Sequence, residues 1–309
     1  EKAQGCVFEM DQEALSRLTH LAQVLGAPWR RIEWQDAPLI VFARDAPSAT
    51  GSASADALAA LIGEAAEEIL GYQGRLSMPE IAVRRTMILS RAWSRVMART
   101  PAPSLERSAT STAEIDVLDV ATPHEGYFLT RSYQLRHPVF AGGMSDVLSR
   151  EVFVVADAAL VLPYDPRSDR VLLVEQFRMG PFGRGDPRPW VLEPIAGRVD
   201  PGERPDACAL RECVEEAHVS LDGLEHISSH YCSPGCSTEL YHCFLGLCDL
   251  SDMKGGLGGL ATEHEDIASH VLSFERVEAL MRSGEINIGP LLLMLLWLQR
   301  ERPRLKAIA

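Results

Sequence analysis

The pattern of apolar and polar positions predicts helices and short strands in the first third of the chain. Apolar side chains recur at helical spacing over 12–25, directly after Asp11, which can cap a helix. Alternation over 5–10 and a β-branched apolar run over 38–43 predict two strands. Helical spacing returns at 56–70 and 79–98. We therefore expect a small α/β segment followed by two helices.

Two segments rich in small and polar residues interrupt these patterns. Residues 44–55 and 100–114 contain proline, serine, threonine and alanine without apolar periodicity, which is typical of linkers. They suggest three regions, namely a segment at 1–50, a helical region with linkers at 51–114 and a larger domain at 115–309.

The larger domain is predicted to be rich in strands. The apolar runs at 158–164 and 171–177 are separated by the turn sequence "DPRSD", which predicts a hairpin. Further strands are expected at 189–197, 226–233, 239–248 and 268–274, with helices starting near Arg204, Arg276 and Gly289. Strands and helices at separate places favour an α+β fold with a mixed sheet between helices.

One predicted helix carries an unusual density of acid. On a helix, Glu212, Glu215 and Glu216 lie within an arc of about 100°. Repulsion between like charges one turn apart costs a helix a few tenths of a kcal/mol per pair. We expect the opposite face to pack on the core through Ala207, Leu210, Val214 and Ala217.

Two interpretations of this acidic helix compete. A solvated acidic face is the simpler one, but it accounts poorly for three carboxylates beside Arg211 after a glycine-containing turn. Clustered carboxylate oxygens are the ligands that hard divalent cations such as Mg²⁺ require. Such a cation can bind substrate phosphates and orient an attacking water. The pattern therefore favours a metal-dependent site.

Composition narrows the classes of partner. A formal net charge of −13 argues against binding nucleic acid through a broad basic surface, but it allows a small anionic substrate held by a metal and a few arginines. The apolar run at 291–298 is too short to cross a bilayer and predicts a buried helix. The seven cysteines form no CxxC pair, which favours reduced thiols, a cytoplasmic protein and no structural zinc.

The acidic stretch resembles the Nudix box, a glycine followed at fixed spacings by glutamates and the motif REUxEExGU, where U is aliphatic. The matching residues are Gly197, Glu203, Arg211, Glu212, Glu215, Glu216 and Val219. Cys213 replaces an aliphatic residue, and His218 replaces the second glycine at a helix end that favours positive φ. We expect some local strain at His218 and no loss of metal ligands.

This resemblance implies a set of roles. Glu212 and Glu216 would be the main metal ligands, joined by Glu215 and by the backbone carbonyl of Ala196. Glu203 and Arg211 would orient these carboxylates. Hydrolysis of a nucleoside diphosphate linked to a second group would then use two or three Mg²⁺ ions, with Mn²⁺ as a possible substitute.

Segments outside the box resemble the ADP-ribose pyrophosphatases over residues 125–309. They are 149–153, 173–178, 189–197, 258–267 and "YCSPGCSTE" at 231–239, where Pro234 stands fifteen residues after Val219. The resemblance implies AMP and ribose 5-phosphate as products, with Arg150 and Arg178 gripping phosphate or carboxylate and Tyr127 stacking on adenine. Each of these side chains could instead have a purely structural role.

The glycine-rich loop at 258–267 is the second informative segment. It carries three acids and can swing over a bound substrate to exclude water. By resemblance Glu263 matches the family's loop carboxylate, the general base or an aid to activating the water. Glu265 is the competing candidate.

Residues 3–18 resemble the second half of a γ-glutamylcyclotransferase-like domain, so 1–50 is identified as a partial domain of that type. The glycine-containing substrate loop of that family is absent, and so is the acidic residue expected after the helix. Fusions of this kind resemble bacterial proteins linked to tellurite resistance. The Nudix resemblance also implies a homodimer that exchanges N-terminal strands.

Two other functions compete with ADP-ribose hydrolysis. One is hydrolysis of another nucleoside diphosphate sugar, such as ADP-glucose or GDP-mannose. The other is a non-catalytic ADP-ribose-binding module, which the intact Glu212, Glu215 and Glu216 disfavour because a sensor gains nothing from a full metal site.

Overall fold

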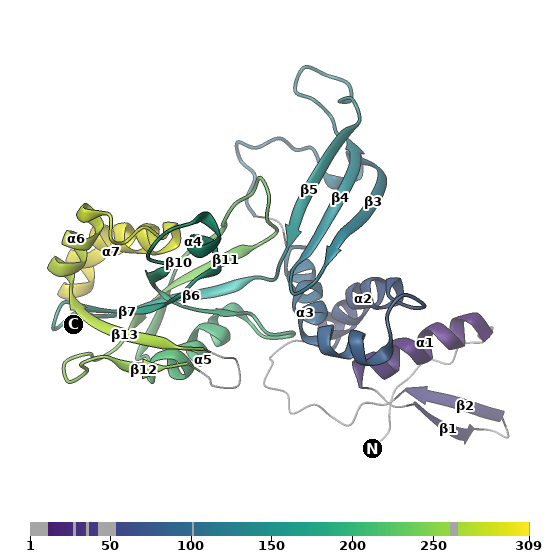
Figure 1. Ribbon diagram of the computed structural model, residues 1–309, viewed down its shortest axis with the longest axis horizontal. Helices are drawn as coiled ribbons and strands as arrows, with labels where there is room; N and C mark the ends of the chain where they lie inside the picture. The colour runs from purple at the N-terminus through teal and green to yellow at the C-terminus, as the bar shows by residue number, and fades with distance from the viewer. Residues whose placement is uncertain are drawn as a thin grey trace. The chain divides into compact units, whose positions relative to one another are not determined.

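The chain forms two compact units, which divide between Pro101 and Ala102. The computed structural model describes residues 12–26, 29–34, 37–42, 54–100, 102–259 and 265–308 (Figure 1). The strand expected at 5–10 lies outside the described residues, as do residues 44–53 of the first expected linker. The second expected linker contains only a short 3₁₀ turn at Thr112–Glu114.

The first unit combines three helices with one strand pair. These elements are α1 (Gln12–Leu25), β1 (Trp29–Trp34), β2 (Ala37–Phe42), α2 (Ala55–Gly71) and α3 (Met78–Met97). The side chain of Ser54 caps α2 by accepting from the Ala57 amide, and Ser77 with Glu80 forms a capping box on α3. Strand β1 was not expected, because three of its six residues are charged.

The second unit contains the predicted mixed sheet, and its strand order is β10-β11-β6-β7-β13-β12. Only β11 and β6 run parallel, and β8 and β9 add to β7 and β6. The expected hairpin is confirmed, since Tyr164 of β6 pairs with Val171 of β7. The strands are β6 (Ala158–Asp165), β7 (Arg170–Phe177), β8 (Trp190–Glu193), β9 (Ile195–Arg198), β10 (Gly223–Tyr231), β11 (Leu240–Leu247), β12 (Gly256–Gly258) and β13 (Ile267–Ser273).

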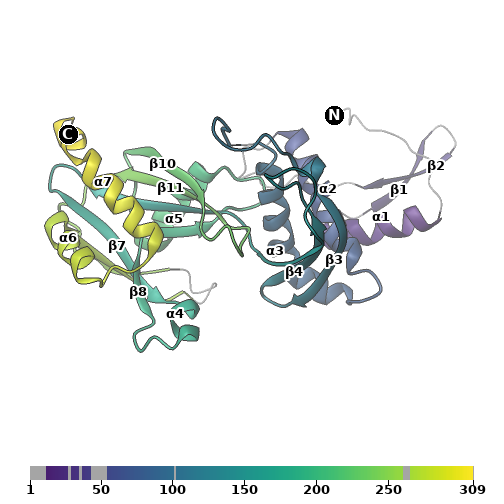
Figure 2. The same ribbon diagram turned by 90° about the horizontal axis from the view of Figure 1, so that it is seen from above.

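Helices cover both faces of this sheet (Figures 1 and 2). Helix α5 (Pro205–Ala217) lies on one face, while α6 (Phe274–Ser283) and α7 (Gly289–Ala307) pack on the other. The expected buried helix at 291–298 is confirmed as part of α7. Its side chains Leu291, Met294, Leu295 and Leu298 are fully buried in the core. Within the described part of the chain, no helix is long and apolar enough to cross a bilayer.

A separate three-stranded sheet precedes the mixed sheet in the second unit. It is formed by β3 (Asp116–Glu125), β4 (Leu129–Arg136) and β5 (Leu148–Val154). The end of β5 is held by the loop after β10, because the Phe153 amide donates to the Cys236 carbonyl at 2.8 Å and Phe153 accepts from Thr238 at 3.0 Å. A short helix, α4 (Met179–Arg184), follows β7.

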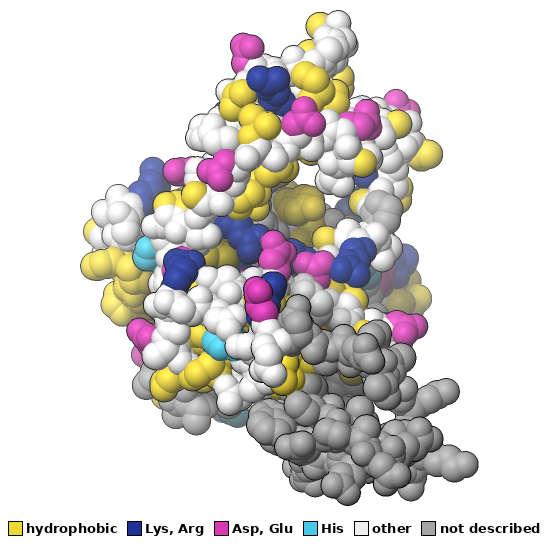
Figure 3. Space-filling view, turned by 90° about the vertical axis from the view of Figure 1, so that its right-hand side faces the viewer, with side chains coloured by type: hydrophobic (Ala, Val, Ile, Leu, Met, Phe, Trp, Pro, Cys, Tyr) yellow, Lys and Arg dark blue, Asp and Glu magenta, His cyan; other side chains and the backbone are white. Residues whose placement is uncertain are grey.

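Charged side chains are mixed over the surface seen in Figure 3. On this face the described Lys and Arg side chains alternate with Asp and Glu and form no broad basic patch.

Candidate active site

Helix α5 turns two of its carboxylates toward the protein interior. Glu212 and Glu216 are 8% and 2% exposed. They share the buried side of the helix with small residues, namely Cys208, Ala209, Cys213 and Ala217. A solvated acidic face is therefore excluded for this pair.

The expected core-facing set on α5 is wrong in part. Leu210 and Val214 are 46% and 52% exposed, and only Ala217 of the four is buried. The apolar stripe was assigned to the side opposite the acids, but the helix packs through the side that carries them. The small residues there let α5 lie close to β9 and β6, and this brings Glu212 and Glu216 down onto the sheet.

Gly197 makes room for one of these carboxylates. A Cβ atom at this position would lie 1.8 Å from Cδ of Glu212, so any larger residue would push the Glu212 carboxylate out of its place. Ala196, the preceding residue of β9, donates its amide to Glu216 Oε2 at 3.3 Å. Both carboxylates therefore lie against strand β9. Glu212 packs against Gly197, and Glu216 accepts from the Ala196 amide.

Arg211 connects the remaining acids of this region. Its guanidinium donates to both oxygens of Glu203 at 3.1 and 3.0 Å. It also donates to Glu212 at 2.5 Å, to Glu215 at 2.9 Å and to the Arg198 carbonyl at 3.2 Å. Glu203 closes its own turn by accepting from the Asp200 amide at 3.0 Å. One planar cation thus fixes three carboxylates relative to strand β9.

Helix α5 ends at His218, which adopts φ 54° and ψ 35°. This left-handed conformation confirms the expectation of positive φ at the position of the missing box glycine. The His218 and Val219 amides donate to the carbonyls of Val214 and Cys213, so the helix end closes in the usual way without glycine.

Burial raises the pKa of both interior carboxylates. The pKa of Glu212 lies at about 7, with burial as the main cause opposed by the charge of Arg211. The pKa of Glu216 lies at about 8, again mainly through burial and then through the neighbouring Glu212 charge. Glu265 raises the pKa of both groups by charge, so its carboxylate belongs to the same site.

These shifts predict how the stability of the metal-free protein depends on pH. Because the folded-state pKa values exceed the ordinary value of 4.5, the folded state holds these protons more tightly than the unfolded state. Stability from this pair is full below pH about 4.5 and falls as pH rises to about 8. We expect a loss of at least about 2 kcal/mol from pH 5 to 8, since each pKa unit corresponds to about 1.4 kcal/mol.

Unfolding in denaturant with a chelator, repeated across this pH range, measures that loss. The double variant Glu212→Gln/Glu216→Gln serves as the control, since neither amide titrates. An equally steep decline in the double variant would assign the effect to other groups.

The donor chemistry of the pair fits a hard divalent cation. Two adjacent buried carboxylates carry excess negative charge in a low-dielectric site, which a cation relieves. In the described residues no three His, Cys, Asp or Glu side chains are arranged to hold a metal ion. Glu212 and Glu215 both form ion pairs with Arg211.

Strand β12 and Gly259, which begin the glycine-rich loop, lie against the end of α5 (Figure 1). A Cβ atom at Gly258 would lie 1.8 Å from the Glu216 carbonyl oxygen, and one at Gly259 would lie 2.7 Å from Cβ of Glu265. Gly259 also has φ +89°, which favours glycine. The chain therefore approaches the backbone of α5 at Gly258 and Gly259, and the charge of Glu265 acts on the buried pair. Glu263 lies outside the described residues.

This close approach predicts different outcomes for two neighbouring glycines. Gly258→Ala should separate β12 from α5 and lower activity by at least about tenfold, because a misplacement of about 1 Å at a site can cost 10²-fold. Gly256→Ala is the matched control, since a Cβ there meets nothing within 4 Å. Steady-state rates of the two variants measure this difference. Equal rates would contradict the importance of the close contact between Gly258 and α5.

Arg178 brings positive charge to the same site. It lowers the pKa of Glu216 through its charge, and its Nε donates to Glu193 Oε2 at 2.7 Å. Glu193, at the end of β8, is a candidate site residue that the sequence analysis did not single out. Its position two residues before Ile195 in "PWVLEPIAG" is the only signal, and it does not reveal which arginine the side chain holds.

The other three candidate substrate residues lie elsewhere in the second unit. Arg150 is exposed on β5, and Tyr127 is 69% exposed in the turn between β3 and β4. Pro234 is exposed in the loop whose Cys236 carbonyl accepts from Phe153. Within the described residues, no hydrogen bond or ion pair joins Arg150 or Tyr127 to the α5 carboxylates. The structure thus groups Arg178 with Glu216 and leaves the other three around β5.

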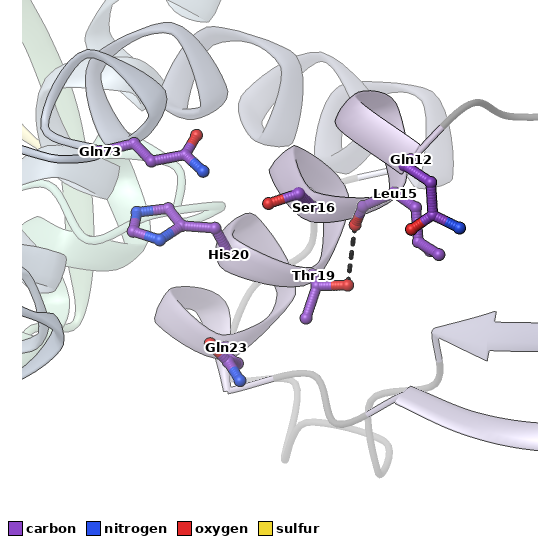
Figure 4. A pocket seen from close by; sticks show the side chains of 7 residues that line it. All are labelled: Gln12, Leu15, Ser16, Thr19, His20, Gln23 and Gln73. Atoms are coloured by element: carbon purple, nitrogen blue, oxygen red, sulfur yellow. Dashed lines mark hydrogen bonds between the residues drawn. The ribbon is translucent and has the colours of Figure 1, made fainter.

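A hollow of about 370 Å³ lies in the first unit (Figure 4). It is lined by Gln12, Leu15, Ser16, Thr19, His20, Gln23 and Gln73. These side chains are neutral amides, hydroxyls, one imidazole and one leucine, and Thr19 donates to the Leu15 carbonyl at 2.8 Å. No carboxylate lines this hollow.

Comparison with known proteins agrees with this geometry. The model of the NUDIX domain matches residues 155–291, which include β6 to α6 and all of α5. An ADP-ribose pyrophosphatase of Haemophilus influenzae is 41% identical over 191 residues, covering 61% of this chain and 88% of that protein. The chain belongs to the NUDIX family.

Two other NUDIX relatives bear on the substrate. An ADP-ribose pyrophosphatase of Escherichia coli K12 is 34% identical over 62% of this chain and 91% of its own length. A GDP-mannose pyrophosphatase of Salmonella paratyphi B is 35% identical over 48% of this chain and 77% of its own length. The ADP-ribose relatives thus match a longer part of this NUDIX chain than the GDP-mannose relative does.

Proposed function

We propose that this NUDIX enzyme hydrolyses the pyrophosphate of ADP-ribose to AMP and ribose 5-phosphate. The main support is the buried pair Glu212 and Glu216 against β9. It lies in a chain that is 41% identical, over 191 residues, to an ADP-ribose pyrophosphatase. A site that retains such costly buried carboxylates supports catalysis over passive binding. It therefore argues against the non-catalytic binding module.

The residues of the site suggest distinct roles. Glu212 and Glu216, with Glu215 and the Ala196 carbonyl, would hold Mg²⁺ or Mn²⁺. When bound, such ions screen pyrophosphate charge and lower the pKa of a bound water. Arg211 and Glu203 keep the carboxylates in place. Arg178 would grip a phosphate oxygen while Glu193 fixes its guanidinium.

A loop carboxylate would accept the proton of the attacking water. Glu265 is supported by its electrostatic coupling to Glu212 and Glu216. Glu263 is supported by its place in the resemblance to the family, and variants of each residue separate the two. The remaining candidates, Tyr127, Arg150 and Pro234, would contact the adenosine or terminal ribose.

We also propose a homodimer in which the sheet of β3, β4 and β5 meets a second copy of the chain. Val117, Leu118, Val120, Tyr127 and Phe128 of this sheet and its turn are each at least 42% exposed. Such a run of exposed apolar side chains supports an interface. Light scattering on the full chain gives the mass, and a monomer would refute the proposal.

For the rest of the chain, residues 1–50 are proposed as a partial γ-glutamylcyclotransferase-like segment, 51–114 as a helical connection and 115–309 as the NUDIX domain. A cytoplasmic location is proposed as well. The six described cysteines are all free thiols, which supports a reducing compartment.

The substrate is tested by a panel of ADP-ribose, ADP-glucose and GDP-mannose at equal concentration with Mg²⁺. We expect the largest kcat/KM for ADP-ribose, with AMP and ribose 5-phosphate released in equal amounts. A larger kcat/KM for GDP-mannose would instead support the function named for the Salmonella paratyphi B relative.

A further inference from the structure

A second set of reactive side chains lies on strands β10 and β11. Ser229 Oγ is 3.0 Å from His242 Nδ1, and His242 Nε2 is 3.1 Å from Asp157 Oδ2. His226 Nε2 lies 3.0 Å from the same Ser229 hydroxyl. Serine, histidine and aspartate are thus connected in series within hydrogen-bond distance, the arrangement that activates a serine nucleophile.

A β-bulge assembles this set. The register of β10 against β11 shifts between His226 and Ser228, so His226 pairs with Phe244 and Ser229 with His242. Because Phe244 and His242 are two residues apart in β11, they lie on one face of the sheet, and the bulge puts His226 and Ser229 on that face too. Without the extra residue, Ser229 would face the opposite side.

Burial decreases from Asp157 to His242 to Ser229, so the carboxylate is held inside the protein while the serine hydroxyl can meet a substrate. Asp157 is 4% exposed, the His242 side chain is 14% exposed, and Ser229 is exposed on the edge strand of the sheet. The buried carboxylate accepts from Nε2 of His242, which leaves Nδ1 to accept from the serine hydroxyl. In the described residues, Ser229 and His242 make no hydrogen bond or ion pair with the acids of α5.

We propose that Ser229 is the nucleophile of a second hydrolytic site, which acts on small carboxylic esters. The Ser229 oxygen bonds to the ester carbonyl carbon while its proton passes to His242 Nδ1. The carbon–oxygen bond to the alcohol breaks, and His242 returns the proton to the departing alcohol. Water then attacks the acyl-serine, giving its proton to His242, and Ser229 is reprotonated as the acid leaves. His226 donates to the oxyanion that forms beside Ser229.

The test uses a fluorophosphonate, which labels activated serines, and p-nitrophenyl acetate as substrate, both with the full chain. Mass spectrometry should place the label on Ser229, and Ser229→Ala should lower ester hydrolysis by at least about 100-fold. Ser228→Ala is the matched control, because Ser228 Oγ also lies 3.1 Å from a histidine, His230, but on the other face of the sheet. That variant should react like the wild type.

Asp157→Asn tests the positioning of His242 by the buried carboxylate. The rate at saturating fluorophosphonate should fall by about 100-fold or more, while the half-saturating concentration and hydrolysis of ADP-ribose stay unchanged. An unlabelled Ser229 in the wild type, or equal ester hydrolysis by Ser229→Ala and Ser228→Ala, would overturn the proposal. These two outcomes do not depend on whether Asp157→Asn folds.

Discussion

Glu216→Gln should lower kcat for ADP-ribose by roughly 10³-fold or more while the protein stays folded. The substitution removes the charge of a proposed metal ligand, and metal-assisted charge stabilisation supplies several kcal/mol, each 1.4 kcal/mol corresponding to tenfold. Folding is retained because the amide oxygen of glutamine can still accept from the Ala196 backbone amide, as Glu216 does at 3.3 Å. Pre-steady-state and steady-state release of AMP, with a melting curve, measures both effects.

The control for Glu216→Gln comes from the same helix. Asp206 lies in the first turn of α5, and its side chain is 42% exposed in an ion pair with Arg204. Asp206→Asn removes a negative charge from α5 without touching the buried pair, so kcat should change by less than about twofold. An equal reduction of kcat by both substitutions would show that the effect comes from any loss of negative charge on α5, and not from the buried pair.

Arg211→Ala should destabilise the second unit by about 3–5 kcal/mol, the usual effect of removing one partner of a buried ion pair. Arg211 forms ion pairs with Glu203, Glu212 and Glu215, and the Glu203 and Glu212 side chains are each only 11% exposed. Without the guanidinium, these carboxylates repel one another in a site with little water. Arg211→Lys should recover only a part of the loss, since the three donors of an ammonium cannot replace the five hydrogen bonds of the guanidinium to three acids and a carbonyl.

Arg204→Ala is the matched control for Arg211→Ala. Arg204 also makes a two-bond contact with a carboxylate, that of Asp206, but its side chain is 66% exposed. Exposed ion pairs contribute at most about 1 kcal/mol. Chemical denaturation in the presence of a chelator compares the variants, and a similar free energy of unfolding for both would show that the Arg211 cluster is not stabilising.

The spacing of glycine, arginine and glutamate in 197–219 predicted a local geometry that the structure shows, with Gly197 against Glu212 and Arg211 bonded to the neighbouring acids. The same holds for the helix end at His218, whose positive φ follows from its place after the last turn of α5. The main strands and helices of the NUDIX domain were predicted as well, since β6 and β7 are continuous apolar runs around a turn.

What the sequence could not supply were contacts between distant segments. The packing side of α5 was wrong because small residues and buried acids face the sheet together, whereas the two larger apolar residues face outward. Periodicity alone favours the opposite orientation. Glu193 was not singled out because its importance depends on its hydrogen bond with Arg178, which follows β7 and is fifteen residues away in the sequence. The Ser229 arrangement depends on a bulge, and no local pattern reveals the register of β10.

A divalent cation held at Glu212 and Glu216 is proposed to support hydrolysis of ADP-ribose. The most direct measurement is AMP release by chelator-treated protein before and after Mg²⁺ is added back. We expect no release above background in the chelator, and release of AMP with an equal amount of ribose 5-phosphate once Mg²⁺ is restored. AMP release in the chelator, or none with Mg²⁺ present, would contradict the claim.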